Sequence, residues 1–377
     1  MKRCLLLFAL ITLIAGCGEG ASETSSGQGT TRVGHVFVII LENEDYGNSF
    51  GPGTAAPYLA QTLPAQGALL ENYYGTGHNS LDNYDAMISG QGPNLLTQQD
   101  CLVYKDFPGT AAIVDGQLIG KGCVYPTSVP SLPDQLEAKN LSWKAYMEDM
   151  GNTPSREAAT CGHPQLNMLD VTQVATATDQ YATRHDPFVY FHSIIDDQPY
   201  CDAHVVSFSG LEADLSAAAT TANFIFITPN LCHDGHDSPC ADGEPGGLIS
   251  INAFLTEWVP KITASPAFQQ DGLLIVTFDE ADSSATDSSA CCGEGPTTNT
   301  AKPGITGLGG GRIGAVLLSP FITPGTVSTM DYNHYSMLRT VEDLFGLPYL
   351  GFAGATGQAG FGSDVFTKKV PELPPKR

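Results

Sequence analysis

The sequence predicts an α/β protein, a three-layer α/β/α sandwich built around a mostly parallel central sheet. Short runs of consecutive apolar residues, typical of strands buried on both faces, alternate along the chain with segments of helical periodicity. The 377 residues are enough for one large domain, and 42% hydrophobic against 15% charged residues exclude a disordered or coiled-coil protein. Because strands and helices alternate, we expect helices on both faces of a parallel sheet.

The expected strands are apolar runs rich in β-branched residues. They are Val36–Leu41, Phe188–Phe191, Phe224–Thr228, Leu273–Phe278 and Ile313–Leu318. The expected helices are Tyr58–Gln66, Leu81–Ile88, Leu132–Lys139, Leu211–Thr220, Leu248–Ile262 and Tyr335–Phe345. Asp282–Gly311 is rich in Ser, Thr, Gly and Pro and has no apolar period, so it is predicted to be a long mobile loop before the last strand.

Residues 1–16 have the features of an export signal. Lys2 and Arg3 precede an apolar run that is too short to span a membrane. The following residues, Ile14–Cys17, are similar to a bacterial lipobox, which implies that Cys17 becomes the lipidated first residue of the mature chain. An ordinary signal peptide followed by a chance cysteine is the alternative. We expect an exported protein, attached through Cys17 to the periplasmic face of a bacterial membrane or to the cell surface.

Composition divides the rest of the chain into three parts. Residues 17–33 are rich in Gly, Ser and Thr and are expected to form a flexible tether. Residues 34–365 are expected to form one folded domain, because they show neither an internal repeat nor a second hydrophobic block. Residues 366–377, which carry Pro and basic residues, are expected to be a disordered tail.

The cysteines agree with export. Apart from Cys4 in the signal and Cys17, eight remain: Cys101, Cys123, Cys161, Cys201, Cys232, Cys240, Cys291 and Cys292. An even number in an oxidising compartment favours disulfides. Cys101 with Cys123 and Cys232 with Cys240 are close enough for local bonds, although spacing alone does not fix the pairing. A zinc cluster is the alternative, but the sequence has no CxxC pair to support it.

The chain is strongly acidic. Lys and Arg number 17 against 40 Asp and Glu, a net charge of −23, and removal of Lys2 and Arg3 with the signal gives 15 − 40 = −25. Such a surface repels phosphate backbones, so we expect no nucleic-acid partner. An anionic substrate would need a local positive centre. With so few basic residues, a metal ion is the natural candidate.

Polar residues follow three of the expected strands. Glu42 and Asn43 follow the first, Asn230 and the segment 232–237 follow the third, and Asp279 and Glu280 follow the fourth. Ligands of parallel sheets gather at these carboxyl ends. One acidic strand end alone is usually a solvated turn or a helix cap, but three together favour a hard-cation site. Mg, Ca and Mn prefer oxygen ligands, while histidine admits Zn or Fe.

Ser80 marks a second centre, because it stands where a loop turns into the expected helix Leu81–Ile88. A hydroxyl there lies near unpaired backbone N–H groups, which stabilise an oxyanion or a phosphoryl group. The alternative is that Ser80 only caps the helix. The sequence has no GxSxG elbow around Ser80, so a Ser-His-Asp esterase is not indicated. His334, at the start of the last helix, either packs at the edge of the core or faces the same site.

These segments, in this order, resemble the bacterial and fungal phosphoesterase family that includes acid phosphatases and non-specific phospholipases C, within the alkaline phosphatase superfamily. The matching pieces are VIILENEDYGNSFG (38–51), HNSLDNYDAMISG (78–90), PNLCHDGHD (229–237), IVTFDE (275–280), SPFITPG (319–325) and HYSMLRTVEDLFGLP (334–348). The resemblance implies an alkaline-phosphatase-like fold with a phosphoesterase catalytic domain over residues 34–365.

The resemblance also implies roles for individual residues. The implied metal ligands are Glu42, Asn43, Ser80, Asp279 and Glu280. Ser80 would be the nucleophile and would form a phosphoseryl intermediate, and a metal beside it would lower the pKa of its hydroxyl. The implied catalytic histidines of the phosphate pocket are His236 and His334, and the implied substrate-binding residues are His78, Asn83 and Asn230.

The chain departs from the family pattern at three positions. Asn79 and Asp82 replace the two prolines of the usual His-Pro-Ser-x-Pro-Asn motif, and Asp82 is unfavourable near an anionic ester unless it points away. Asn230 stands where two-metal relatives place an acidic ligand. A neutral amide weakens a second cation site, although Asp234 offers a compensating carboxylate. We therefore expect one divalent metal ion (Ca, Mg, Zn, Mn or Fe) and leave a second open.

The function expected from this resemblance is hydrolysis of a phosphoric monoester by a secreted, metal-dependent enzyme. The substrate would be a small phosphate ester or a phospholipid, and no protein partner is evident. One alternative is a phosphodiesterase or phospholipase C on the same scaffold, although relatives of that kind tend to be longer. The other is a non-enzymatic surface lipoprotein, which the retained Glu42, Ser80 and Asp279 argue against.

Overall fold

The computed structural model describes residues 33–108 and 112–368. The export signal, Cys17, all but the last residue of the tether and the tail from residue 369 lie outside the described residues, so these predictions stay predictions. At the start of the expected tail, Phe366 packs against the core and the Lys368 N–H donates to the Phe321 carbonyl. No helix in the described ranges combines the length and the apolar character needed to cross a bilayer.

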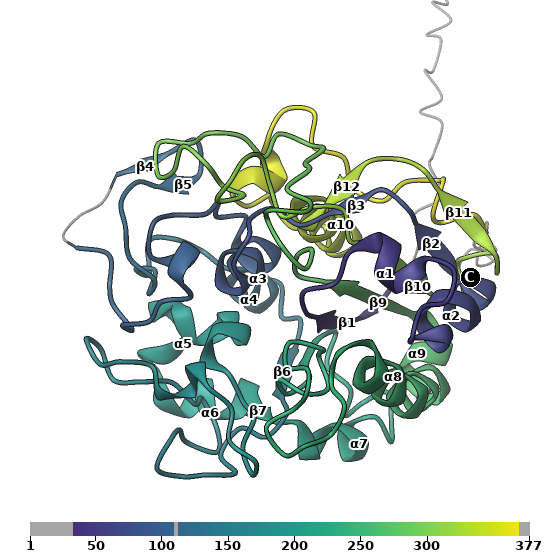
Figure 1. Ribbon diagram of the computed structural model, residues 1–377, viewed down its shortest axis with the longest axis horizontal. Coiled ribbons are helices and arrows are strands. Elements are labelled where there is room, and N and C mark those ends of the chain that lie inside the picture. Colours follow the sequence, from purple (N-terminus) through teal and green to yellow (C-terminus); the bar gives the residue numbers. More distant parts are fainter. Residues whose placement is uncertain (1–32, 109–111, 369–377) are drawn as a thin grey trace, which may run out of the picture. The chain divides into compact units, whose positions relative to one another are not determined.

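An eight-stranded sheet forms the centre of the described chain (Figure 1). In spatial order its strands are β11 (Thr326–Ser328), β2 (Ala68–Leu70), β10 (Ala315–Leu318), β9 (Gly272–Phe278), β1 (His35–Leu41), β8 (Phe224–Thr228), β6 (Trp143–Met147) and β7 (Val205–Ser207). Every neighbouring pair is parallel except the two pairs that β10 makes with β9 and β2. The predicted mixed α/β fold with a mostly parallel sheet is confirmed.

The central strand β1 is apolar throughout because both of its faces are covered. Every residue from Val36 to Leu41 is fully buried. Val36 lies opposite Phe224 of β8 on one side and Leu273 of β9 on the other. This parallel register brings the carboxyl ends of β1, β8 and β9 to the same edge of the sheet, where the polar residues of the sequence begin.

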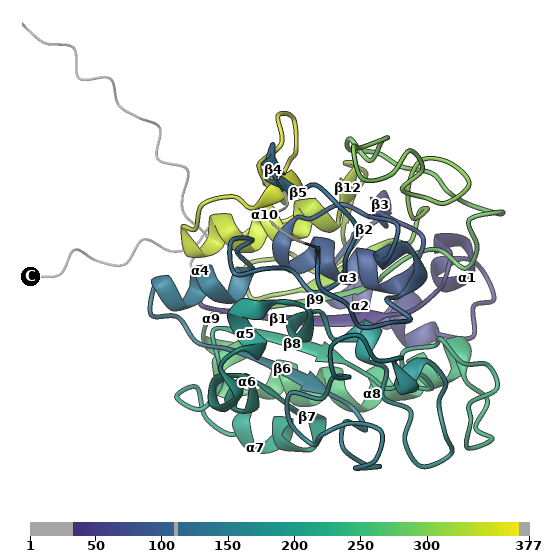
Figure 2. The same ribbon diagram turned by 90° about the vertical axis from the view of Figure 1, so that its left-hand side faces the viewer.

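Helices cover both faces of the sheet. They are α1 (Tyr46–Phe50), α2 (Leu63–Gln66), α3 (Ser80–Ser89), α4 (Leu132–Ala138), α5 (His192–Ile195), α6 (Gln198–His204), α7 (Leu211–Asp214), α8 (Gly247–Ala264), α9 (Pro266–Asp271) and α10 (His334–Phe345). Helices α3, α4 and α10 lie on one face and α2, α8 and α9 on the other (Figure 1). Figure 2 shows α3 beside α10, and the two are in contact. Two-stranded pairs, β3 (Tyr73–Tyr74) with β12 (Tyr332–Asn333) and β4 (Ile113–Val114) with β5 (Gln117–Leu118), lie outside the sheet.

Two expectations about elements were wrong. The apolar run Phe188–Phe191 is not a strand: Pro187–Tyr190 form a 3-10 helix, in which the aromatic side chains are buried by stacking, as Phe188 is on Trp143. The central sheet also contains four strands that the sequence does not predict: β2, β6, β7 and β11. The helix expected over Leu211–Thr220 ends at Asp214.

Four disulfides bond the eight cysteines of the domain. Both local pairs, Cys101–Cys123 and Cys232–Cys240, form, together with Cys161–Cys201 and the sequence neighbours Cys291–Cys292. The last pair lies in Asp282–Gly311, which contains no helix or strand, as expected of a loop.

Candidate active site

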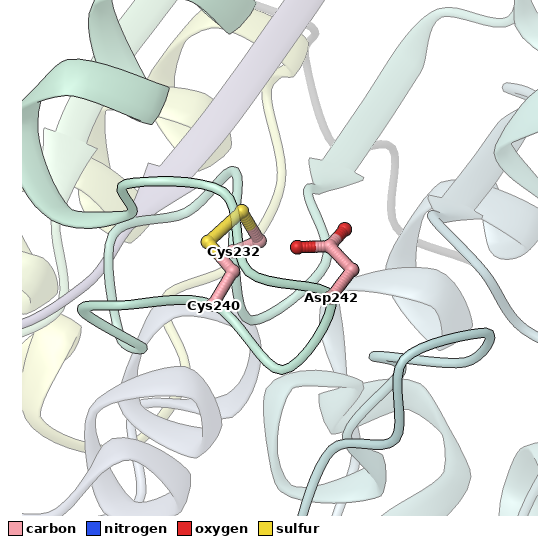
Figure 3. Close-up of side chains that lie close together, drawn as sticks. All are labelled: Cys232, Cys240 and Asp242. Atoms are coloured by element: carbon pink, nitrogen blue, oxygen red, sulfur yellow. A yellow bond between two sulfur atoms is a disulfide. The ribbon is translucent and has the colours of Figure 1, made fainter.

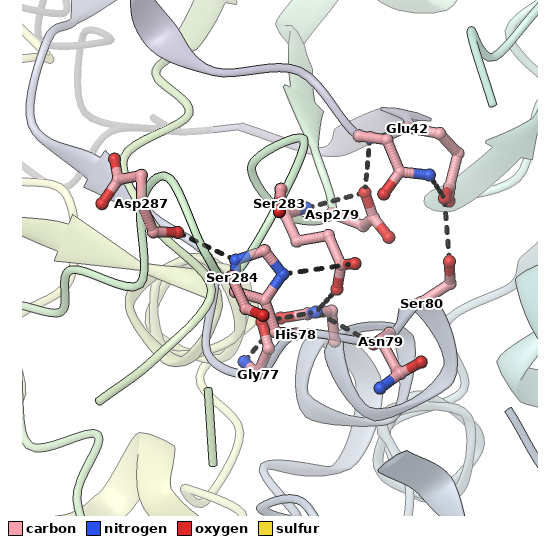
Figure 4. Close-up of polar contacts among 12 residues, drawn as sticks. Glu42, Gly77, His78, Asn79, Ser80, Asp279, Ser283, Ser284 and Asp287 are labelled. Atoms are coloured by element: carbon pink, nitrogen blue, oxygen red, sulfur yellow. Dashed lines mark hydrogen bonds and ion pairs between the residues drawn. The ribbon is translucent and has the colours of Figure 1, made fainter. Parts of the chain in front are cut away.

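Three elements bring a carboxylate pair and a hydroxyl together. Glu42 follows β1, Asp279 follows β9, and Ser80 is the first residue of α3. The Ser80 hydroxyl donates to Glu42 Oε2 at 2.8 Å (Figure 4). Asp279 Oδ1 accepts the N–H groups of Asn43 and Glu280 at 3.1 and 2.7 Å. The predicted convergence of two strand ends and the helix start is therefore present.

Glu42 is surrounded by polar groups within the core. Tyr84 donates to Glu42 Oε1 at 2.7 Å, and His185 Nε2 lies 3.4 Å from Glu42 Oε2. The other ring nitrogen of His185 lies 3.1 Å from Asp234 Oδ2. Glu42, His185 and Asp234 are buried, and one ligand atom from each lies within 4.8 Å of the others. These three residues are a candidate metal group.

The carboxylates of this site repel one another in a medium that solvates them poorly. Burial raises the pKa of Glu42 well above its ordinary value, and the nearby Asp279 and Asp234 raise it further. Burial also raises the pKa of Asp234 well above normal and that of Asp279 to about 6. Carboxyls in this situation need protons or a cation to offset their charge.

The donor set fits a divalent cation. Asp279 Oδ2 and His185 Nε2 are buried and have no hydrogen-bond partner among the described residues. Buried polar atoms without partners are costly, so they indicate a ligand. Two or three carboxylates and one imidazole would suit Zn, Mn or Fe as well as a harder cation.

The other two predicted metal ligands have different surroundings. Glu280 Oε2 accepts from Asn83 Nδ2 at 2.9 Å, and Glu280 Oε1 lies 3.5 Å from His78 Nδ1. The side-chain nitrogen of Asn43 (Nδ2) lies 3.4 Å from Glu42 Oε2. The backbone of Asn43 is in the left-handed region, with φ of 57°. Asn43 thus lies beside the candidate metal group, whereas Glu280 contacts the loop before α3.

The loop before α3 is held by His78 and Asn83. Asn83 Oδ1 accepts the N–H groups of Thr76 and Gly77 at 2.8 and 2.9 Å. His78 Nε2 lies 2.9 Å from the Asp287 carbonyl oxygen (Figure 4). These two predicted substrate-binding side chains therefore contact protein groups and fix the backbone that presents Ser80. The Asp82 carboxylate is buried and packs directly against Gly77 of this loop: a side chain at Gly77 would clash with it, since an added Cβ would lie 2.0 Å from the carboxylate.

The loop after β8 supplies the other predicted residues. Asn230 Oδ1 accepts the N–H groups of Cys232 and His233, and its amide nitrogen donates to Asp149. His236 lines a cleft of about 330 Å³ together with Asn43, so it lies at the opening beside the candidate metal group.

A second group of possible metal ligands occurs in the same loop. Cys232 and Cys240 lie near Asp242, but their sulfur atoms are bonded to each other (Figure 3). A disulfide has no thiolate to offer a metal, so this group closes the loop instead.

His334 lies behind the site. Its Nε2 is 2.6 Å from the Asp279 carbonyl oxygen, and its Nδ1 is 3.2 Å from the Tyr73 hydroxyl. Burial lowers the pKa of His334 to about 4, so the ring is neutral at physiological pH. In this position both ring nitrogens contact protein groups, and the ring holds the backbone of Asp279.

Sequence reasoning missed His185 and Tyr84. His185 follows no strand: it ends the 3-10 helix Thr183–His185, between Arg184 and Asp186. Neither spacing nor periodicity marks it, because its position depends on packing against α3. From the sequence, Asp234 is expected only as a compensating carboxylate at a second cation site, whereas the structure places it in the candidate metal group.

Together these features define an α/β protein with a buried group of metal-ligand type and a serine hydroxyl at the carboxyl edge of a mostly parallel sheet. The chain belongs to the Phosphoesterase family, whose model matches residues 52–348. The resemblance found in the sequence is thereby confirmed.

Curated relatives are similar over most of this chain. It is 25% identical over 350 residues to an acid phosphatase of Aspergillus fumigatus, covering 90% of this chain but 63% of the relative. It is 22% identical over 325 residues to a phosphatidylinositol-3-phosphatase of Mycobacterium tuberculosis, covering 85% and 79%. The chain thus spans less than two thirds of the Aspergillus protein.

Solved structures are similar in fold. The BT33336S-sulf chain from Bacteroides thetaiotaomicron, solved in work on the metabolism of multiple glycosaminoglycans, has a TM-score of 0.51 at 10% identity, covering 89% of this chain and 82% of that one. A protein in the alkaline phosphatase superfamily from Vibrio parahaemolyticus has a TM-score of 0.48 at 11% identity, covering 85% and 68%.

Proposed function

We propose that this protein is a metal-dependent phosphoric ester hydrolase, a phosphomonoesterase similar to acid phosphatases, with Ser80 as its nucleophile. One observation carries the proposal. The Ser80 hydroxyl, at the start of α3, donates at 2.8 Å to Glu42, a member of the buried group with His185 and Asp234. The relatives named acid phosphatase and phosphatidylinositol-3-phosphatase support a phosphate ester as the substrate.

The residues of the chain have distinct tasks in this reaction. Ser80 Oγ attacks phosphorus, and Glu42 Oε2 is the acceptor already bonded to its proton. His236, which lines the cleft, donates the proton with which the alcohol leaves and regains a proton from the attacking water in the second step. Water then cleaves the phosphoseryl bond, which releases inorganic phosphate and restores the serine hydroxyl.

Glu42, His185 and Asp234 would hold the cation, with Asp279 and Ser80 beside them. A bound divalent cation would lower the pKa of the serine hydroxyl and offset negative charge on the phosphoryl group. One tightly held ion is proposed, and its identity is a matter for elemental analysis.

Export and membrane attachment are part of the proposal. Residues 1–16 act as a lipoprotein signal, Cys17 carries the lipid, and residues 17–33 tether a catalytic domain that spans residues 34–365. Four disulfides in one domain support an oxidising compartment.

The test is a substrate panel run with the purified protein and two serine variants. Wild type should hydrolyse p-nitrophenyl phosphate, and Ser80→Ala should abolish turnover while the far-UV spectrum and Tm are retained. Ser216→Ala, at an exposed position, is the matched control and should retain full activity. Equal activity in Ser80→Ala would remove Ser80 from the mechanism. Faster cleavage of bis-p-nitrophenyl phosphate or phosphatidylcholine than of the monoester would establish the phosphodiesterase or phospholipase C alternative.

A further inference from the structure

Arg184 is a buried cation next to the candidate site. It directly precedes His185, and it is only 3% exposed. Its Nη2 lies 3.0 Å from His236 Nε2, and its Nη1 donates to the Gln173 carbonyl at 3.3 Å. A guanidinium group has five N–H donors, so these two contacts use less than half of its hydrogen-bonding capacity.

No carboxylate neutralises this guanidinium at close range. Within residues 33–108 and 112–368, no Asp or Glu oxygen lies within 4.0 Å of Arg184, whereas Arg156 pairs with Asp179 at 2.7 Å. The nearby Asp234 is already used by His185 and by the N–H of His236. Asp100 and Asp234 lie near enough for the Arg184 charge to lower their pKa values, but neither forms an ion pair with it. The unused N–H donors of the buried guanidinium are therefore suited to an anion from outside the chain.

Arg184 also connects the two sides of the site. Its contact with His236 reaches the wall of the cleft. On the other side lies Asp100, whose pKa burial raises and the Arg184 charge lowers. Asp100 in turn accepts the N–H of Leu81, the residue after Ser80, at 3.0 Å. Arg184 thus lies between the cleft and the start of the helix that carries the proposed nucleophile.

We propose that Arg184 is a substrate-binding residue that binds the phosphoryl oxygens of the substrate, an inference that rests on the proposed function. Its planar guanidinium donates two parallel hydrogen bonds to two oxygens of a tetrahedral oxyanion. Arg184 thereby exchanges its contact with the His236 ring for charge-assisted hydrogen bonds to the phosphoryl oxygens. Arg184 gives this strongly acidic chain a positive centre made from its own residues, in addition to a cation.

The experiment uses the full-length metal-loaded protein and inorganic phosphate as the probe. Phosphate affinity is measured twice: by the rise of Tm with phosphate concentration, and by the inhibition constant against p-nitrophenyl phosphate. Arg184→Gln should raise the dissociation constant of phosphate from the Tm measurement, its inhibition constant and KM, each about tenfold or more, because charge-assisted hydrogen bonds are lost. Arg184→Lys should fall between, since an ammonium group keeps the charge but not the paired geometry. Arg339→Gln is the control, because Arg339 stacks on Tyr349 and donates to the Ala353 carbonyl; it should leave both constants unchanged.

Wild-type phosphate affinity in Arg184→Gln would overturn the proposal. If that variant does not fold, Arg184→Lys decides the question, and an unchanged inhibition constant in it has the same meaning. The proposed function can fail separately. Phosphate that stabilises wild type but not Arg184→Gln, in a protein that hydrolyses no ester, would leave an anion site without an enzyme. Ester hydrolysis with unchanged phosphate affinity in both variants would leave the enzyme and remove Arg184 from its site.

Discussion

The Tyr84 ring stacks parallel to the imidazole of His185, with ring centroids 5.3 Å apart and planes 5° apart. Its hydroxyl donates to Glu42 Oε1, while Ser80, four residues earlier on α3, donates to Glu42 Oε2. Residues four apart lie on the same face of a helix. One turn of α3 therefore fixes both oxygens of Glu42 and the ring of His185.

We expect Tyr84→Phe to weaken metal binding without unfolding the protein. The variant keeps the stacked ring but leaves Glu42 Oε1 without its donor, so the carboxylate loses its fixed orientation. The loss of a ligand-orienting hydrogen bond typically costs about 10-fold or more in metal affinity. Metal titration of the apoprotein, followed by calorimetry and by recovered activity, measures this. Tyr190→Phe is the matched control, since the buried Tyr190 hydroxyl has no hydrogen-bond partner among the described residues. Equal affinity in both variants would contradict a role for the Tyr84 hydroxyl.

Removal of the metal should abolish turnover and lower the Tm. Without a cation, the carboxylates Glu42, Asp234 and Asp279 remain buried, and burial raises the pKa of each; the Asp279 charge raises the pKa of Glu42 and Asp234 further. A ligand present at 100 times its dissociation constant stabilises a fold by about 2.7 kcal/mol. Thermal melts of the chelated protein, with each candidate ion added back, measure the gain.

Asp279→Asn separates charge from folding in this experiment. It removes one of the repelling carboxylates, so the apoprotein should melt at a higher temperature than wild-type apoprotein, while added metal should raise its Tm less. Apoprotein of lower Tm that still responds fully to metal would show that Asp279 does not contribute to the cation site.

Glu342→Gln should stabilise the protein at alkaline pH. Glu342 is fully buried; its Oε1 accepts the Leu350 N–H, and its Oε2 has no partner among the described residues. Burial raises the pKa of Glu342 to about 8 from an ordinary value of 4.5. The folded state therefore binds a proton more tightly than the unfolded state does, and stability contributed by this group falls as pH rises from about 4.5 to about 8.

The uncharged amide removes that dependence. At pH 8 the variant should be more stable than wild type by up to about 4 kcal/mol, since each unit of the pKa shift corresponds to about 1.4 kcal/mol, and the gain should vanish near pH 4.5. Melts of wild type and variant across this range measure it, with the exposed Glu244→Gln as the control. A gain that does not change with pH would contradict the assignment.

Two disulfides should differ in what their removal costs. Cys161–Cys201 closes a loop of 40 residues and Cys232–Cys240 one of 8. Loop entropy predicts losses of about 4 and about 2.5 kcal/mol for the respective double Ser variants. The short loop carries Asp234 and His236, so its variant should lose more activity despite the smaller loss of stability. Denaturant unfolding and kcat/KM, measured on both variants, test this inverse order.

The sequence predicted the strands that can be recognised as unbroken apolar runs within a single segment of the chain. Strands β1, β8 and β9 are unbroken apolar runs, because parallel strands in the middle of a sheet are covered on both faces. Strand β6 was not predicted because the charged residue Lys144 interrupts its apolar run. In the structure the Lys144 side chain forms an ion pair with Asp214 at 2.7 Å. The four-residue run Phe188–Phe191 shows the opposite error, since so short an apolar segment does not distinguish a strand from a 3-10 turn.

The residues of the candidate site also fall into two groups, those that the sequence predicts and those that it does not. Glu42, Ser80 and Asp279 follow strands or begin a helix, so the expected sheet places them at one edge before any coordinates are known. His185 is the last residue of the 3-10 helix Thr183–His185. Its approach to Glu42 depends on stacking against Tyr84, a contact between segments about 100 residues apart that leaves no local pattern. Residues held by such long-range packing require the structure.

The hydrogen bond from the Asn43 N–H to the Asp279 carboxylate joins positions 236 residues apart in the chain. A polypeptide still on the ribosome therefore has β1 and Glu42 long before β9 and Asp279 have been synthesised. Any fragment that ends before β9 lacks Asp279, which lies beside the candidate metal group, and lacks the strand that pairs with β1. If the proposed cation binds there, its complete site would exist only after β9 has been synthesised and has paired, in the compartment where the chain completes its folding.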